Sequence, residues 1–330
     1  LEFGYCSGCP ADFVTASSPN ETANFDPEVT TEGVIGVQHS FLPELVVGAS
    51  YTYRDRADIN WNRNILETPS GMRRPELATD YEFAGTVGQD LPDGSSGTTQ
   101  RYALRDGFSN TGGDLQTTSD RSIQSNAFSM NFIKRLSNQW MARGYINWAS
   151  GEWDVPSSYN AGSDPNPNEF GSDISGTLYG EDVGTRSGAK GDVFLQSSWS
   201  WNLNGMYQFA PDRPYGFNVA ANLYGREGYP LPYYAASNPG DGLGTRNISV
   251  LDGDIDRFRA DNIFTTDLRL EKEFAASGNV GFTFSIDIFN IFNEAYVMQR
   301  ERNQNTSRYD YLDETLAPRI WRLGVRLNWR

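Results

Sequence analysis

Few residues of this chain could carry chemistry, and two of them are its only cysteines, Cys6 and Cys9, spaced as C-x-x-C. A zinc site would need further ligands, and the sole histidine, His39, lies within a strand-like pattern. A redox dithiol would need a βαβ context that the sequence lacks. We expect a local disulfide in an exposed loop, with free thiols as the alternative. A disulfide implies an oxidising compartment.

An acidic run, Asp252, Asp254 and Asp256, is a weak candidate for a calcium loop. Arg257 stands where such a loop needs a glycine, and the distal bidentate glutamate is missing. A solvated acidic loop is the favoured interpretation, and we expect neither a metal nor another cofactor. One histidine cannot supply a Ser-His-Asp set, and no glycine-rich phosphate loop leads from a strand into a helix. The sequence predicts that the protein is not an enzyme.

Three tyrosines set among prolines, Tyr229, Tyr233 and Tyr234, are the candidate ligand-binding residues. Their rings could stack on sugars or on peptide side chains. The alternative is packing within the loop that carries them, and this is the favoured interpretation.

Composition limits what these residues can belong to. The 330 residues are 38% hydrophobic and 13% aromatic, with 33 glycines, which suits strands with one apolar face rather than a thick aliphatic core. The net charge of −15 argues against binding to nucleic acid and against anchoring by a basic patch on anionic lipid. No run approaches the 18 apolar residues of a transmembrane helix, as expected for a membrane barrel.

The C-terminal stretch, residues 318–330, shows the clearest pattern. Its apolar residues alternate with polar residues and glycine at the period of a strand. The set Arg322, Gly324, Leu327 and Trp329 resembles the signal by which the bacterial barrel-assembly machinery recognises outer-membrane proteins. Arg330 follows the final aromatic residue, which is a small departure from that signal.

Similar alternation predicts about eleven strands along the chain, with short turns and long loops in regular succession. This arrangement is typical of a transmembrane barrel, which has short periplasmic turns and long extracellular loops. We expect extracellular loops at 154–191 and 226–260, and further loops at 65–77 and 107–120. The expected strands are 34–39, 45–60, 81–89, 100–105, 121–136, 140–153, 193–209, 216–225, 261–274, 280–299 and 318–330.

The strand period also assigns side chains to the two faces of the expected barrel wall. The residues predicted to face lipid are Phe128, Phe132, Trp148, Trp199, Trp201, Leu268, Phe282, Phe284, Leu323 and Leu327. The residues predicted to face the lumen are Ser129, Asn131, Asn147, Asn202, Thr283, Ser285 and Asp287.

Several stretches resemble the C-terminal barrel half of TonB-dependent outer-membrane receptors, particularly the Oar-like branch. FNIFN followed by the terminal strand is the most specific element, and the first hundred residues carry little of the resemblance. The matching stretches are 188–199, 224–230 (YGREGYP), 256–259 (DRFR), 267–272 (DLRLEK), 289–293 (FNIFN) and 318–324 (PRIWRLG).

The resemblance implies an all-β, antiparallel transmembrane barrel in the bacterial outer membrane. It also implies active import of an extracellular ligand (a peptide, glycan or chelate), driven by TonB through a plug domain. Neither a plug nor a TonB box is visible, and the chain reads as one barrel portion over 1–330. A barrel of about 22 strands would need roughly 660 residues at this strand length. The chain begins at Leu1 without a signal peptide, so we expect a processed or partial chain.

Two other functions stay open at this point. One is a structural or adhesive outer-membrane barrel whose long loops contact other cells, without transport. The other is a soluble secreted all-β protein, for example one that binds carbohydrate.

Overall fold

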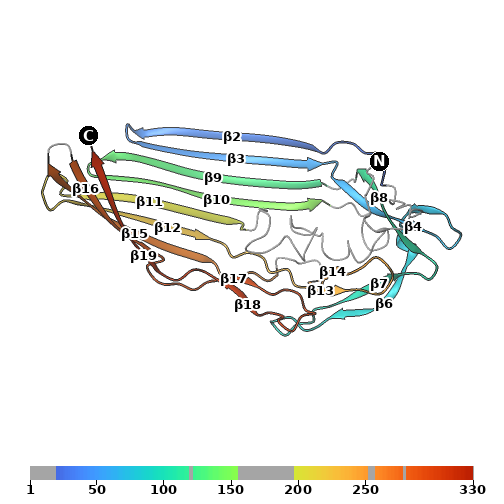
Figure 1. The fold of residues 1–330 in the computed structure, drawn as a ribbon. Coiled ribbons are helices and arrows are strands. Elements are labelled where there is room, and N and C mark those ends of the chain that lie inside the picture. The colour runs from blue at the N-terminus through green and yellow to red at the C-terminus, as the bar shows by residue number, and fades with distance from the viewer. Residues whose placement is uncertain (1–19, 119–121, 155–196, 252–256, 278–279, 330) are drawn as a thin grey trace, which may run out of the picture.

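The computed structural model describes residues 20–118, 122–154, 197–251, 257–277 and 280–329. Its main feature is a nine-stranded antiparallel sheet in the order β19-β16-β15-β12-β11-β10-β9-β3-β2. Figure 1 shows these strands side by side, with the short turns gathered at one end. The strands are β2 (Val29–Leu42), β3 (Leu45–Ala57), β9 (Ser122–Ser137), β10 (Trp140–Asp154), β11 (Trp199–Phe209), β12 (Phe217–Arg226), β15 (Ile263–Ser277), β16 (Val280–Phe289) and β19 (Ile320–Trp329).

The pairing register confirms the predicted division of the sheet into two faces. Phe128 lies opposite Trp148, which lies opposite Trp199, so these aromatic residues share one face. Ser129 lies opposite Asn147 on the other face. The remaining residues of the two predicted sets follow the same alternation through the pairings of β12, β15, β16 and β19. The all-β architecture with an antiparallel main sheet is therefore confirmed, and the two-residue strand β1 (Glu21–Thr22) pairs in parallel with β8 (Ser109–Thr118) outside that sheet. Closure into a barrel of 22 strands stays a prediction.

The two-residue turn between β9 and β10 shows how the short turns are held. Asn138 and Gln139 have φ of 50° and 72°, the positive values that a tight hairpin turn requires. Glutamine adopts such values at a cost, and Lys134 offsets it. The Lys134 ammonium donates to the carbonyls of Ser137 (3.1 Å) and Trp140 (3.0 Å), and it lies 4.0 Å from the centre of the Trp140 ring.

Shorter strands lie beyond the opposite end of the sheet (Figure 1). In the described residues the strands number nineteen, against about eleven expected. The ten strands outside the large sheet form one four-stranded sheet and three two-stranded sheets. These elements are β1 (Glu21–Thr22), β4 (Asn60–Glu67), β5 (Arg73–Pro75), β6 (Tyr81–Gly88), β7 (Thr98–Leu104), β8 (Ser109–Thr118), β13 (Tyr234–Ser237), β14 (Arg246–Ser249), β17 (Val297–Arg300) and β18 (Leu312–Thr315), with one 3₁₀ turn at Ala78–Asp80.

Two loop expectations are wrong. Residues 65–77 include the end of β4 and all of β5, and most of 107–120 is β8. β8 has the sequence SNTGGDLQTT, which shows no alternation. It is a strand because β4, about 50 residues earlier in the chain, supplies an antiparallel partner for its backbone groups. The expected strand 280–299 also ends early, at Phe289, because Asn290 takes a φ of 50°.

The buried apolar residues of the described chain lie almost entirely outside the large sheet. One cluster comprises Leu91, Leu231, Tyr233, Ala235, Val250 and Leu251, and a second comprises Leu66, Tyr81 and Leu104. Ile263, at the start of β15, is the exception. The long strands instead expose large apolar side chains, for example Leu323 (78%) and Trp329 (84%). Among the described residues, no helix is long and apolar enough to cross a membrane.

The faces can be tested by introducing single cysteines at Phe284 and Ser285 and labelling intact membranes with a membrane-impermeant thiol reagent. We expect labelling at position 285, on the polar face, and protection at position 284, on the apolar face. Labelling at 284 with protection at 285 would contradict the register, because a slip of one residue exchanges the two faces.

Candidate functional site

The apolar face of the sheet carries an aromatic band near the short turns. Trp140 lies opposite Tyr207, and Phe274 lies opposite Phe282. Trp329, at the end of β19, lies opposite Val280 at the same end of the sheet. Each of these five aromatic side chains is exposed, so they form a girdle rather than a core.

A second aromatic band crosses the same face towards the long loops. The rings of Phe128 and Trp148 stack at 5.9 Å between centroids, and those of Trp199 and Phe264 stack at 6.0 Å. Trp140 and Trp148 are eight residues apart on β10, which corresponds to about 27 Å along the strand. The pairs Tyr207 and Trp199, and Trp329 and Trp321, have the same separation. This distance is close to the height, about 25 Å, of the apolar band between the aromatic girdles of outer-membrane barrels.

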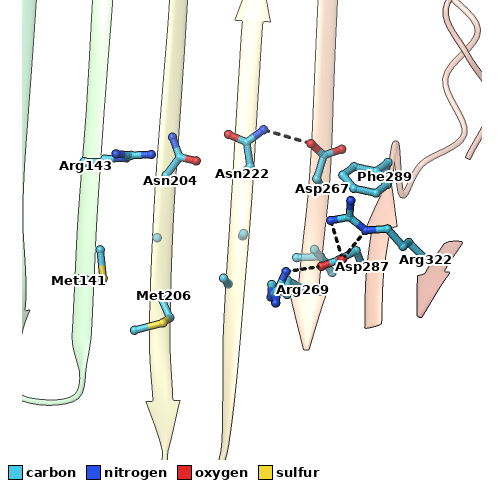
Figure 2. A pocket seen from close by; sticks show the side chains of 14 residues that line it. Met141, Arg143, Asn204, Met206, Asn222, Asp267, Arg269, Asp287, Phe289 and Arg322 are labelled. Carbon is cyan, nitrogen blue, oxygen red and sulfur yellow. Dashed lines mark hydrogen bonds and ion pairs between the residues drawn. The ribbon is translucent and has the colours of Figure 1, made fainter. Parts of the chain in front are cut away.

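The opposite, polar face contains a hollow of about 580 Å³. Figure 2 shows its side chains reaching in from several neighbouring strands. Small residues on β11 and β12 make room for it, among them Gly205 and Ala220. Charged and amide side chains provide much of the wall. Phe289 also lines the hollow, and Met141 and Met206 lie on the side of the short turns.

Two arginines hold the carboxylate of Asp287 at one end of the hollow (Figure 2). The Asp287 side chain is only 7% exposed, and it lies 3.2 Å from Arg269 and 2.9 Å from Arg322. Arg269 also donates to Glu271 at 2.7 Å. A buried carboxylate is costly unless it is paired and hydrogen-bonded, and this carboxylate has a cation on each side.

Amide side chains continue the polar face across the neighbouring strands. Asn202 donates to Asn222 at 2.8 Å, and Asn222 donates to Asp267 at 3.1 Å. Asp267 in turn accepts the backbone N–H of Asn290 at 2.9 Å. The inner wall is thus tied to the chain reversal that follows β16.

Arg143, on β10, supplies a further guanidinium to the hollow (Figure 2). Its side chain is exposed, and within the described residues it forms no ion pair. The charged lining residues, Arg143, Arg269 and Arg322 against Asp267 and Asp287, sum to 3 − 2 = +1, whereas the whole chain carries −15. The hollow can therefore accept hydrogen-bonding, neutral or anionic groups.

The FNIFN stretch forms a stable corner between β16 and β19. The Asn290 side chain donates to the carbonyls of Glu294 (2.8 Å) and Ala317 (2.9 Å) and accepts the N–H of Glu294 at 2.9 Å. The Asn293 side chain accepts the N–H of Arg319 at 2.9 Å. Asparagine is needed at both positions because each takes a positive φ, of 50° and 56°, and also bonds the neighbouring backbone.

The YGREGYP stretch, residues 224–230, connects β12 to the segment that follows. Its close approach to residues 259 and 260 forms a junction that we call the neck. The Arg226 guanidinium, only 6% exposed, lies 3.6 Å from the centre of the Tyr229 ring. The Glu227 carboxylate accepts a hydrogen bond from the Arg259 guanidinium at 3.1 Å, and Ala260 donates its N–H to the carbonyl of Tyr229 at 2.8 Å. A Cβ on Gly228 would overlap the carbonyl of Ala260, so the two chain segments approach as closely as they do only with glycine there.

Of the three candidate tyrosines, Tyr233 lies within the larger loop-end core. It is 2% exposed, and its hydroxyl donates to Asp310 at 2.6 Å. Burial, together with this carboxylate, raises the pKa of Tyr233. Tyr229 and Tyr234 are half-buried, beneath Arg226 and Arg302 respectively. Tyr233 therefore packs the loop, which leaves Tyr229 and Tyr234 as the more accessible candidates.

The loop-end core is closed by polar contacts between distant segments. Gln89 donates its N–H to the Gln304 side chain at 3.0 Å, and Gln304 donates back to the carbonyl of Gln89 at 2.9 Å. Arg257 lies 2.9 Å from Asp93. Hydrogen bonds from the hydroxyl and N–H of Ser95 lower the pKa of Asp93 to about 2, which keeps this partner charged. The described residues of this segment, 226–251 and 257–260, are thus packed rather than forming an open loop.

The residues of the terminal pattern divide between the two faces of β19. Arg322 and Gly324 lie on the polar face, opposite Asp287 and Ser285. Leu327 (60% exposed) and Trp329 (84%) lie on the apolar face. The structure therefore gives the two halves of this pattern different surroundings.

Other candidates lie outside the described residues. These are Cys6 and Cys9, the acidic run Asp252, Asp254 and Asp256, and almost all of the expected loop 154–191. Within the described part of the chain, no group of three or more histidine, cysteine, aspartate or glutamate side chains could hold a metal ion.

No protein-family model and no curated protein matches the sequence. Solved structures do resemble the fold. The outer membrane transporter YddB from Escherichia coli shows 13% identity and a TM-score of 0.46, over 94% of this chain and 34% of that chain. BauA, the ferric preacinetobactin receptor from Acinetobacter baumannii, shows 11% identity and a TM-score of 0.47, over 91% of this chain and 29% of that chain. The ferripyoverdine receptor of the outer membrane of Pseudomonas aeruginosa shows 11% identity and a TM-score of 0.48, over 92% of this chain and 27% of that chain.

The chain resembles part of an outer-membrane receptor. It spans about a third or less of the length of these structures. TM-scores below 0.5 describe a general arrangement of strands, so function is proposed from the residues themselves.

Sequence reasoning named Asp287 as a residue of the polar face but missed the hollow around it. Asn204, Asn222, Asp267 and Arg269 all occupy alternate positions within their strands, and that alternation was the available signal. Their meeting point depends on the pairing of β12 with β15, which a segment of 36 residues joins. Alternation within each strand carries no information on that pairing.

Replacing Gly228 by alanine tests the neck. We expect Gly228→Ala to destabilise the packing of residues 229–251 by about 1–3 kcal/mol, because the added Cβ must push the Ala260 carbonyl away. Limited proteolysis should then cut throughout 229–251, whereas within this range the unaltered protein should be cut mainly at the partly exposed bend 238–244. Gly205→Ala is the matched control, because its Cβ would meet no atom closer than 3.7 Å. Equal cleavage in both variants would contradict the assignment.

Proposed function

We propose that this chain is the C-terminal barrel portion of a TonB-dependent receptor in the bacterial outer membrane, and that the complete protein imports an extracellular ligand. The observation that carries the proposal is that the large sheet exposes its apolar face instead of burying it. Long strands expose an apolar face with two aromatic bands, and their other face is polar and hollowed. A sheet of this kind is stable with lipid on one side and water or protein on the other.

The motifs that resemble the Oar-like branch support the finer assignment. YGREGYP builds the neck, and FNIFN builds the corner that returns the chain to its final strand. Both are places where few other residues would fit the backbone. We assign the chain to the Oar-like branch on this basis.

The polar face supplies the import pathway in this proposal. Its asparagine side chains and the Arg143 guanidinium offer hydrogen bonds to a polar solute. The paired charges around Asp287 keep the wall polar while neutralising one another. The ligand is a peptide, a glycan or a chelate, and the protein's partners are outer-membrane lipid, the barrel-assembly machinery and TonB acting through a plug domain.

We assign ligand capture to the long segments 154–191 and 226–260, which we expect to be extracellular. Loops on a rigid scaffold commonly carry binding residues. Within the second segment, Tyr229 and Tyr234 are half-buried, whereas Tyr233 belongs to the core. We therefore assign the contact role to Tyr229 and Tyr234.

A structural or adhesive barrel without transport is the second candidate function. The observation that favours it is the packing of the loop-end segments into clusters of their own, which gives a firm outer surface. Such a surface suits contact with another cell as well as capture of a solute.

Import is tested with the complete protein in cells with and without functional TonB. Peptides, oligosaccharides and ferric chelates remaining in the medium are measured by mass spectrometry. We expect one of these classes to be depleted only when both the protein and TonB are present. Depletion that is independent of TonB, or no depletion together with increased cell aggregation, would contradict import and favour the adhesive function.

The assembly role of the final strand is tested by comparing Trp329→Asp with Trp321→Asp. Both tryptophans lie on the apolar face of β19, eight residues apart. A carboxylate at the membrane interface costs about 0–1 kcal/mol, so folding energy alone predicts a mild defect for Trp329→Asp. Recognition by the assembly machinery predicts a severe loss of outer-membrane protein, measured by immunoblot. Normal insertion of Trp329→Asp together with failure of Trp321→Asp would contradict the signal.

A further inference from the structure

The pairing of the last two strands of the sheet is not set by a turn. β16 ends at Phe289 and β19 begins at Ile320, so 30 residues separate them. β9 and β10, by contrast, are joined by only two residues, and a turn of that length fixes the register of a hairpin. The register of β19 on β16 must therefore come from side-chain contacts. Some are made at the FNIFN corner, where Asn290 and Asn293 bind Ala317 and Arg319, and the others lie between the two strands.

The apolar face of this strand pair does not distinguish one register from another. Leu323 lies opposite Ile286, with apolar partners on both sides of this pair along the two strands. A slip of two residues keeps every side chain on its own face and again places apolar against apolar. The outer row therefore tolerates such a slip at little cost.

The polar face, by contrast, fits only one register. Arg322 lies opposite Asp287 and donates to it at 2.9 Å, and Asp287 is 7% exposed. A slip of two residues in one direction places Ile320 opposite Asp287, and in the other direction it places Gly324 there. After either slip, Arg322 no longer lies directly opposite Asp287, so the buried carboxylate no longer faces its second cation.

A close contact on the polar face reinforces the same register. A Cβ on Gly324 would lie 2.5 Å from the hydroxyl of Ser285, so a residue larger than glycine would force this hydroxyl to rotate out of its present position. Further along, the Asn328 side chain donates to the Thr283 hydroxyl at 2.9 Å. The polar row thus combines an ion pair, a steric fit and a hydrogen bond at successive inward positions.

We propose that the polar row of β19, with Asp287 as its counterpart, is a register-setting site for the last strand. Arg322 and Gly324 act inside the protein, by fixing how β19 pairs with β16 and by completing the wall of the hollow. The side chains of Leu327 and Trp329 point outwards from the same strand, where they can contact lipid or the assembly machinery. The site does not depend on which ligand the protein imports.

Cysteine cross-linking in the complete protein tests the register directly, in a background with Cys6→Ser and Cys9→Ser. The pair Ile286→Cys and Leu323→Cys reports the native register, since these residues lie directly opposite. The pairs Ile286→Cys with Trp321→Cys, and Ile286→Cys with Val325→Cys, report the two slipped registers. Disulfides are formed in membranes with copper phenanthroline, and only the folded, heat-modifiable protein is counted.

We expect Asp287→Asn, which keeps the side-chain shape but removes the charge, to raise the ratio of slipped to native cross-links. A rise of about tenfold corresponds to about 1.4 kcal/mol of lost preference. Glu273→Ala is the matched control, because this exposed carboxylate on β15 also faces inwards, opposite Thr283. It should leave the ratio unchanged. An unchanged ratio in Asp287→Asn, or the same rise in both variants, would overturn the proposal.

A suppressor pair tests the steric part and remains informative if single variants fold poorly. Gly324→Ala should lower the native cross-link, and adding Ser285→Gly should restore it by removing the hydroxyl that the new methyl group meets. Failure of Ser285→Gly to restore the native product would overturn the steric part of the site.

Discussion

The large sheet depends on one constraint, which is that its apolar side chains have no protein to pack against. In the described residues the buried apolar side chains lie at the loop end, while the long strands expose aliphatic and aromatic groups along one face. Water would make such a face costly, at about 25 cal/mol for each Å² left exposed. Lipid removes that cost, and it also demands that each backbone donor and acceptor be paired within the sheet. Antiparallel pairing links all nine strands of the large sheet, from β2 at one edge to β19 at the other, and so meets most of that demand.

The loop end follows the opposite rule. Its segments come from distant parts of the chain, and they bury their apolar residues against one another, as a water-soluble domain does. Two of the short stretches that connect this region to the sheet are the neck at Arg226–Gly228 and the corner at Asn290 and Asn293. Each relies on a residue with little tolerance for change, a glycine where two backbones touch and asparagines where φ is positive. The geometry of any ligand-binding surface at the loop end therefore depends on these connections.

The polar face is stabilised by pairing rather than by exclusion of water. Asp287 between Arg269 and Arg322, and the amide series that ends at Asp267, leave the wall hydrophilic while satisfying its buried groups. Two of these contacts, Asp287 with Arg322 and Asn222 with Asp267, connect strands that long segments separate in the sequence. The same side chains that give the hollow its chemistry therefore also hold the strands in place.

Much of this arrangement was available from the sequence. Alternation alone assigned Phe128, Trp148, Phe284 and Leu323 to one face and Asn131, Ser285 and Asp287 to the other, because a strand repeats every two residues. Compositional patterns also identified the short turns. Tertiary structure decided three things: that β8 is a strand, that Tyr233 is a core residue rather than a contact residue, and that Asp287 meets Arg322. Each depends on a partner distant in the chain, and the strand period fixes the face of a side chain but not its neighbour across a long connection.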